Sequence, residues 1–265
     1  MSIPIRMGDG TIGESVWLAE DTFRLSLSGT GLGQGISPGQ FFMVKAWEGN
    51  DPLLRRPISV SDVAGEAIYF VIRVTGKGTR LIAGRRPGDR LSLVGPLGRG
   101  FLIPPGYDRH ILVAGGVGIA PFPLLARAIR NTGQTVDIKL LYGERDSSRL
   151  IDTGTMGFGE IETSVITEDG SSGRKGLVTD LLSRVLTGEG EPAAIYASGP
   201  WPMLKAVQAQ VEGHRGPLQV SMESFMGCGL GSCMGCVIAV KGEGERSYER
   251  VCHSGPVFDG RDVIF

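Results

Sequence analysis

The stretch Tyr107–Arg130, YDRHILVAGGVGIAPFPLLARAIR, decides the fold. The apolar run Ile111–Ala114 is short enough for a buried strand, and it breaks into a glycine turn that leads into a helical pattern. Gly115, Gly116 and Gly118 occupy this turn, where backbone can approach a pyrophosphate at a helix N-terminus. The turn alone is weak evidence, because any tight strand-to-helix turn favours glycine and the spacing departs from G-x-G-x-x-G.

Strand and helix candidates alternate along the chain after this turn. They lie at residues 136–143, 162–167, 177–186, 193–199 and 202–211. This rhythm predicts a parallel sheet with helices on its faces. The strand candidate at 193–199 ends in Ser198 and Gly199, so a second turn of small residues is expected at the carboxyl edge, where open α/β sheets bind their ligands.

The chain before residue 104 has a different pattern. Short stretches of apolar and β-branched residues alternate with glycine or proline turns, at residues 15–28, 40–47, 57–63, 67–76 and 89–98. They predict an antiparallel β-barrel. We therefore expect a multidomain β plus α/β protein. Its predicted parts are a barrel at 1–103, a parallel-sheet nucleotide-binding domain at 104–220 and a small C-terminal module at 221–265.

Composition narrows the class of function. Hydrophobic residues make up 41% of the 265 residues and charged residues 21%, which is enough to build ordered cores. Lysine and arginine number 27 against 28 acidic residues, so we expect no nucleic-acid partner. The N-terminal sequence MSIPIRMGDG lacks the apolar core of a signal peptide, and no apolar run is long enough to span a membrane. We expect a cytoplasmic protein that does not bind membranes.

The four cysteines carry the most specific signal. Cys228, Cys233, Cys236 and Cys252 have the spacing C-x4-C-x2-C-x15-C. Plant-type two-iron clusters use three close thiolates of this spacing and one distant cysteine. The glycines between them allow backbone N–H groups to turn toward the sulfides. Structural zinc usually pairs two C-x2-C knuckles, of which this chain has one. The spacing predicts a [2Fe–2S] cluster, with zinc and buried free thiols as the alternatives.

An arginine and serine pair in the barrel predicts a phosphate-containing ligand. Arg56 and Ser59 flank Pro57, and an arginine fork suits a phosphate while a short hydroxyl can reach a flavin ring atom. Downstream, Gly76, Gly78 and Thr79 offer N–H groups and a hydroxyl to a second phosphate. The alternative for Arg55 and Arg56 is a solvated charged pair.

Together these motifs resemble the ferredoxin–NADP reductase superfamily. RPIS at 56–59 is similar to its flavin motif, GKGT at 76–79 to its flavin pyrophosphate loop, and GGVGIAP at 115–121 to its nicotinamide-nucleotide loop. With the tail included, MGCGLGSCMGC at 226–236 and VCHSGPVF at 251–258 resemble the electron-transfer subunits of NAD-dependent (class 1B) dihydroorotate dehydrogenases. The similarity covers essentially the whole chain.

This resemblance implies FAD in the barrel, NAD(H) on the α/β domain and a [2Fe–2S] cluster facing a partner. The partner is an FMN-containing catalytic subunit that oxidises dihydroorotate in pyrimidine biosynthesis, and we expect a heterotetramer. The resemblance assigns FAD to Arg56, Pro57, Ile58, Ser59, Val71, Ile72, Arg73, Gly78 and Thr79, and the cluster to the four cysteines. FAD is expected between cluster and nicotinamide because it exchanges either one or two electrons. No side-chain acid or base is required.

One position departs from the superfamily. Ser198 stands where a cysteine near the nicotinamide is common, although serine can still form a hydrogen bond there. The choice between NAD and NADP is open: Glu144 and Asp146 would repel a 2′-phosphate, but Arg145 between them would attract one.

The sequence leaves three alternative functions open. Similar subunits of sulfide dehydrogenase or electron-bifurcating ferredoxin–NADP oxidoreductase tend to have an aspartate near the first ligand position, where this chain has Cys228. A stand-alone flavin or oxygenase reductase and a redox-sensing or iron-storing module are the remaining alternatives. The tail also carries four apolar residues suited to a stable interface, Phe225, Met226, Leu230 and Met234.

Overall fold

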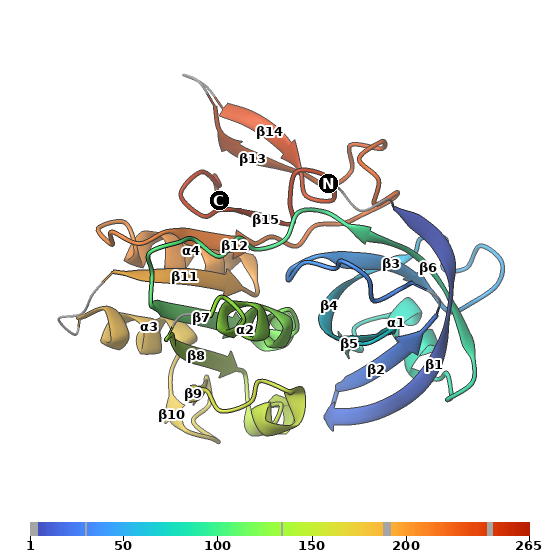
Figure 1. Cartoon of the computed structure of the whole chain (residues 1–265), viewed down its shortest axis with the longest axis horizontal. Coiled ribbons are helices and arrows are strands. Elements are labelled where there is room, and N and C mark those ends of the chain that lie inside the picture. The colour runs from blue at the N-terminus through green and yellow to red at the C-terminus, as the bar shows by residue number, and fades with distance from the viewer. Residues whose placement is uncertain (1–4, 30, 134, 188–191, 243–245) are drawn as a thin grey trace.

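The barrel and the α/β domain lie side by side, and the C-terminal segment runs along both (Figure 1). The computed structural model describes residues 5–29, 31–133, 135–187, 192–242 and 246–265. Within these residues no helix combines the length and apolarity that crossing a membrane requires.

The first domain is a closed six-stranded antiparallel barrel, as the sequence predicts. Its strand order is β1-β2-β5-β4-β3-β6. The strands are β1 Arg6–Ala19, β2 Thr22–Ser28, β3 Phe41–Lys45, β4 Arg56–Ala64, β5 Ala67–Arg73 and β6 Arg90–Leu97. Their inward side chains form one apolar core, in which Leu25, Val60 and Phe70 have no exposed surface. A helix that the sequence analysis did not predict, α1 Lys77–Ala83, follows β5.

The first predicted strand was wrong in its extent. The run 15–28 is two strands joined by a turn at Glu20 and Asp21, and β1 begins nine residues before Ser15, at Arg6. The early half of β1 is glycine-rich, and glycine in a strand weakens the usual sequence pattern. A Cβ at Gly10 would lie 3.0 Å from the Leu93 side chain, so this glycine allows β1 to pack closely inside the barrel.

The second domain is built on a seven-stranded sheet of order β10-β9-β8-β7-β11-β12-β15. Six of its strands are parallel: β7 Arg109–Gly115, β8 Asp137–Glu144, β9 Glu162–Thr167, β10 Arg174–Lys175, β11 Ala193–Ser198 and β12 Leu218–Ser221. Its longer helices are α2 Phe122–Arg130, α3 Val178–Thr187 and α4 Trp201–Gln210, and its short 3-10 turns are η1 Gly116–Ile119, η2 Ser147–Arg149 and η3 Thr153–Met156. The predicted parallel sheet with helices is confirmed.

The C-terminal segment both forms a hairpin and completes this sheet. Strands β13 Val237–Lys241 and β14 Arg246–Arg250 pair with each other, whereas β15 Val257–Asp259 pairs antiparallel with β12. The domain limits at 103 and 220 stay a prediction, and the sheet itself continues past residue 220.

Apolar packing joins all three parts of the chain. Met43 of β3 and Leu97 of β6 belong to the same buried cluster as Cys236 and Cys252. Val71 of β5 belongs to a second cluster together with the core of the α/β domain. The barrel, the sheet and the cysteine loop are therefore held in one arrangement by burial of apolar surface.

Candidate functional site

Two cavities lie at the junction of the barrel with the carboxyl edge of the sheet. The first, here the barrel cavity, extends from β4 and β5 to the turn after β7 and to residues 221–226. The second, the sheet cavity, extends from the ends of β7 and β8 to the first turn of α4. Each has a volume of about 390 Å³. The sheet cavity lies at the edge where open α/β sheets bind their ligands.

Most residues that the sequence assigned to FAD line the barrel cavity. They are Arg56, Pro57, Ile58, Ser59, Val71, Ile72, Arg73 and Thr79. Gly78 lies beside them, since a Cβ built on it would be 2.5 Å from Nε of Arg56. The absence of a side chain at Gly78 thus makes room for the Arg56 guanidinium beside the turn that opens α1.

Arg56 is held by an aromatic ring that the sequence analysis did not single out. Its guanidinium carbon lies 5.6 Å from the centre of the Trp47 ring, and the Trp47 indole N–H donates to the carbonyl of Pro52 at 2.6 Å. Within the described residues Arg56 forms no ion pair with a carboxylate, and its hydrogen bonds go to the carbonyls of Leu54 and Arg55. A half-buried cation without an acidic partner fits a phosphate of FAD.

The Thr79 hydroxyl braces the loop before α1. It accepts the N–H groups of Thr75 at 3.0 Å and Gly76 at 3.1 Å. This network holds the GKGT turn in shape, so Thr79 both shapes and lines the barrel cavity.

The glycines of the turn after β7 allow close packing, and they also line the two cavities. A Cβ at Gly118 would lie 2.2 Å from the carbonyl oxygen of Ser198, and one at Gly115 would lie 2.4 Å from the sulfur of Met203. Gly115 and Gly116 line the sheet cavity, whereas Gly118 and Ser198 line the barrel cavity. Gly199 lies against Gly115, because a Cβ built on Gly199 would be 3.1 Å from the Gly115 Cα. The two predicted turns therefore meet where the two cavities adjoin.

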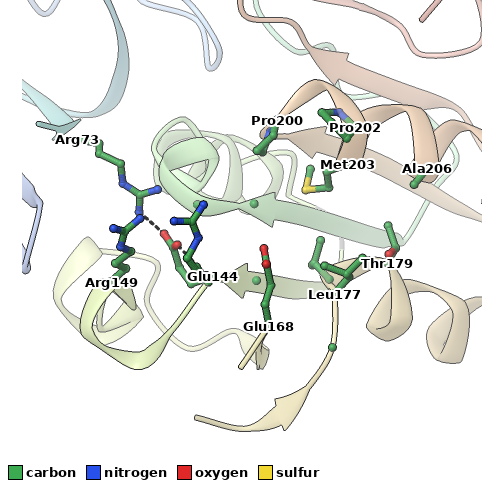
Figure 2. Close-up of a pocket in the computed structure, with 16 residues that line it drawn as sticks. Arg73, Glu144, Arg149, Glu168, Leu177, Thr179, Pro200, Pro202, Met203 and Ala206 are labelled. Atoms are coloured by element: carbon green, nitrogen blue, oxygen red, sulfur yellow. Dashed lines mark hydrogen bonds and ion pairs between the residues drawn. The ribbon is translucent and has the colours of Figure 1, made fainter. Parts of the chain in front are cut away.

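The sheet cavity contains a buried ion pair between the two domains. Figure 2 shows Arg73 extending from the barrel toward Glu144, the last residue of β8. The side chain of Glu144 is 3% exposed. The Arg73 pKa is raised: burial alone would lower it, but the hydrogen bond and charge of Glu144 outweigh that effect.

The remaining charges of the sheet cavity come from the loops beyond β8 and β9. Arg145, Arg149 and Glu168 line it, and Figure 2 shows Glu168 on the side facing Met203. The sequence suggested that Asp146 would repel a 2′-phosphate. In the structure Asp146 accepts a hydrogen bond from the Ser148 N–H at 3.1 Å and does not line the cavity.

The cysteines are brought together as two pairs. Cys228 lies beside Cys233, and Cys236 beside Cys252. The Leu230 N–H donates to the Cys228 sulfur at 3.3 Å, and the Cys252 N–H donates to the Cys236 sulfur at 3.4 Å. Burial opposes ionisation of Cys228, but the N–H groups of Leu230 and Cys233 outweigh it and lower its pKa to about 6. Burial and the neighbouring Cys236 raise the pKa of Cys252 to about 12. Among the described residues no three potential ligands converge on one metal position.

A [2Fe–2S] cluster fits these pairs. Such a cluster places two thiolates on each iron, so its four sulfurs need not converge on one point. A Cβ at Gly227 would lie 3.3 Å from the Cys233 sulfur and one at Gly235 3.5 Å from it, so glycine keeps the space beside this sulfur open. Met234 has φ of 57°, an uncommon conformation for a residue with a side chain, as the tight loop between Cys233 and Cys236 requires.

The cluster loop is exposed on one side and packed on the other. Cys233 is exposed and Cys228 partly so, whereas Cys236 and Cys252 are buried. Leu230 and Met234 are 46% and 54% exposed. Met226 was wrongly grouped with these contact residues, because it is 8% exposed and belongs to the core. Phe225 is exposed and also lines the barrel cavity.

Known proteins share both the fold and the tail. The family model "Iron-sulfur cluster binding domain of dihydroorotate dehydrogenase B" matches residues 223–264, and "Oxidoreductase NAD-binding domain" matches residues 112–209. The dihydroorotate dehydrogenase B (NAD(+)) electron transfer subunit of Geobacillus thermodenitrificans is 40% identical over 253 residues, which cover 93% of this chain and 94% of that one. The subunit of Bacillus caldolyticus is 38% identical over 96% of this chain and 97% of that one.

The chain belongs to the family of dihydroorotate dehydrogenase B electron transfer subunits.

Solved structures of related oxidoreductases share the fold. The structure of an NADH-dependent reduced ferredoxin-NADP oxidoreductase matches with a TM-score of 0.85 and 29% identity, covering 96% of this chain and 89% of that one. A ferredoxin NADP+ reductase from Neisseria gonorrhoeae matches with a TM-score of 0.66 at 17% identity, which shows the fold alone. The comparisons confirm the prediction that the chain is part of an oxidoreductase. They also confirm the predicted cofactors, which are FAD, an iron–sulfur cluster and NAD(H).

Sequence reasoning missed the residues that support the predicted ligands. Trp47 follows a strand in a loop, and nothing in the local pattern marks it as the neighbour of Arg56. Asp21 lies in a two-residue turn but hydrogen-bonds to Arg73 across 52 residues of chain. Both contacts depend on how the barrel closes, which periodicity does not reveal.

Proposed function

We propose that the subunit carries electrons from a dihydroorotate-oxidising FMN partner to NAD+, with the cysteine loop as the entry point. FAD is assigned to the barrel cavity, the nicotinamide dinucleotide to the sheet cavity and the cluster to the four cysteines. When bound, FAD supplies the change between single-electron exchange with the cluster and two-electron exchange with nicotinamide.

The chain's own residues would perform binding and orientation. Arg56 and the backbone around Gly78 would hold the FAD phosphates, and Ser59 would hydrogen-bond to the flavin ring. The backbone of Val71 and Ile72 would line the ring, while Ser198 would hydrogen-bond near the nicotinamide. None of these steps needs a side-chain acid or base.

The observation that carries the proposal is the shared wall between the barrel cavity and the cluster loop. The segment from Ser221 to Met226 lines the barrel cavity, and Cys228 follows two residues later. At Gly229 the loop packs on β3, where a Cβ would lie 2.5 Å from Met43. The cysteine loop thus adjoins the barrel cavity and Cys233 is exposed, an arrangement that would suit transfer between FAD and a partner.

The partner surface is proposed around the exposed side of the loop. Leu230, Met234 and Val237 are exposed apolar residues of this region, at 46%, 54% and 38%. A stable complex is expected to cover such a surface. We assign the FMN-containing catalytic subunit to it, in a heterotetramer, and place the complex in the cytoplasm, where thiols are kept reduced. No nucleic acid or membrane takes part in this proposal.

NAD is proposed over NADP because two carboxylates that would repel a 2′-phosphate, Glu144 and Glu168, line the sheet cavity, with Arg73 paired to Glu144. Glu144 is buried there and Glu168 lines it. The relatives named for NAD(+) support the same choice. Arg145 and Arg149 lie on the outer loops and are the residues that would favour a 2′-phosphate.

The assignment is tested by reconstitution. Dihydroorotate-dependent NAD+ reduction is measured for the isolated, cofactor-loaded chain and for its mixture with an FMN-containing dihydroorotate dehydrogenase subunit. We expect dihydroorotate-dependent NAD+ reduction only in the mixture. The isolated chain should oxidise NADH with artificial dyes. Full activity in the isolated chain would refute the subunit assignment, and activity restored by a sulfide-oxidising or bifurcating partner instead would favour the alternative.

A further inference from the structure

Arg73 lies where the two cavities meet. Of the residues that line the barrel cavity and the sheet cavity, Arg73 is common to both. The flavin motif assigns it to FAD, yet Figure 2 shows its side chain directed to the sheet cavity. The direction of its side chain therefore indicates a role other than FAD binding.

Groups from both domains hold the guanidinium. Its Nε donates to Asp21 at 3.2 Å and to Thr22 Oγ1 at 3.4 Å, both at the turn between β1 and β2, and its Nη2 donates to Glu144 Oε1. The side chain of Arg73 is 17% exposed. Because all three acceptors are fixed by the fold, the guanidinium has little freedom to turn toward another ligand.

Glu144 is itself fixed at the end of its strand. Its Oε2 accepts the Arg145 N–H at 3.2 Å, and the buried Tyr142 hydroxyl lies 3.5 Å from its Oε1. The pair also packs on the nucleotide turn: a Cβ at Gly116 would lie 2.9 Å from Nη1 of Arg73. Gly116 has φ of 59° and leaves this space to the guanidinium.

We infer that the Arg73–Glu144 ion pair is a positioning element that sets the distance between the flavin ring and the nicotinamide. It joins β5 of the barrel to β8 of the sheet at the place where the cavities meet. Hydride exchange between a nicotinamide and a flavin carries one proton with two electrons, and it would require the reacting atoms to be about 3–3.5 Å apart. This inference rests on the proposed assignment of FAD and NAD(H) to the two cavities.

The test replaces both partners so that no buried charge is left alone, with Arg73→Met combined with Glu144→Gln. The control is Asp62→Asn, which breaks another ion pair between the domains. Arg127 Nη2 and Asp62 Oδ1 are 2.7 Å apart, but neither residue lines either cavity. FAD content and thermal unfolding are measured first. The rate of flavin reduction at saturating NADH follows, and then the charge-transfer absorbance when NAD+ is added to the chemically reduced protein.

We expect the double variant to keep its FAD, to lose the charge-transfer band and to be reduced at least about ten-fold more slowly. Asp62→Asn should keep the band and the wild-type rate. An unchanged band and rate in the folded double variant would overturn the inference, as would loss of FAD, which would make Arg73 a flavin ligand. A wild-type protein that retains FAD but is not reduced by NADH would overturn the assignment of the cavities on which the inference rests.

Discussion

The Arg56 guanidinium is oriented by an aromatic ring and not by an acidic side chain. A cation over a tryptophan face is stabilised by roughly 0.5–2 kcal/mol, depending on burial. We therefore expect Trp47 to contribute to FAD binding through its contact with Arg56. This arrangement leaves the positive charge of Arg56 available to a phosphate.

Replacing Trp47 tests this role. Trp47→Leu should raise the FAD dissociation constant about five-fold, corresponding to about 1 kcal/mol of lost orientation, and Trp47→Phe should recover most of the affinity. FAD binding to the apoprotein is measured by calorimetry. In an Arg56→Met background, Trp47→Leu should have no further effect. Trp17→Leu is the control, because the Trp17 ring packs on Phe23. An equal loss in the Arg56→Met background would show that Trp47 acts on FAD independently.

The paired cysteines lead to a prediction about metal content. We expect about two irons and two acid-labile sulfides per chain after anaerobic purification, because the spacing and the two pairs suit a two-iron site. Iron, zinc and sulfide are measured by elemental and colorimetric analysis. Stoichiometric zinc without sulfide would contradict the assignment.

At the scale of elements, the junction of β7 with β11 controls how closely the two turns approach. Gly118 allows this approach, since a Cβ there would overlap the Ser198 carbonyl, a backbone atom that cannot rotate away. Gly118→Ala should cost about 1–3 kcal/mol of stability and widen the gap beside Ser198.

The measurement for Gly118→Ala is the free energy of unfolding in urea together with the Michaelis constant for NADH. Gly213→Ala is the matched control, because nothing lies within 4 Å of a Cβ at Gly213. Equal stability of the two variants would show that the turn has more room than the structure indicates.

The elements were predictable from sequence to the extent that local pattern determines them. The strand Arg109–Gly115 and the helix Phe122–Arg130 follow from apolar periodicity and the glycine turn between them. The start of β1 at Arg6 could not be predicted, because the glycines of this strand hide its alternation of apolar and polar residues. The joining of β15 to the sheet could not be inferred either, since pairing between strands far apart in sequence leaves no local signal.

The residues that line the barrel cavity were predictable from sequence, but the contacts that support them were not. RPIS and Thr79 of the GKGT motif line that cavity, while the binding of a cluster by the four cysteines stays a prediction from their spacing. The contacts of Arg73 with Glu144 and Asp21 join residues far apart in sequence. They arise only when the barrel and the sheet pack together.

In the whole molecule, one continuous arrangement joins the sheet cavity, the barrel cavity and the cysteine loop. The apolar cluster shared by Met43, Cys236 and the sheet holds the cysteine loop against the barrel. Electron transfer through the chain then depends on rigid packing. We propose that electrons from the partner reach NAD+ through the cysteine-bound cluster.

The measurement that tests this claim most directly compares wild type and Cys233→Ser in complex with the FMN-containing partner. Cys233 is exposed and is a proposed cluster ligand, so we expect its loss to remove the cluster while the barrel and its FAD remain. We predict that the variant keeps wild-type NADH oxidation with an artificial dye but loses dihydroorotate-dependent NAD+ reduction at least about a hundred-fold. A cluster-free variant that reduces NAD+ from dihydroorotate at the wild-type rate would contradict the account.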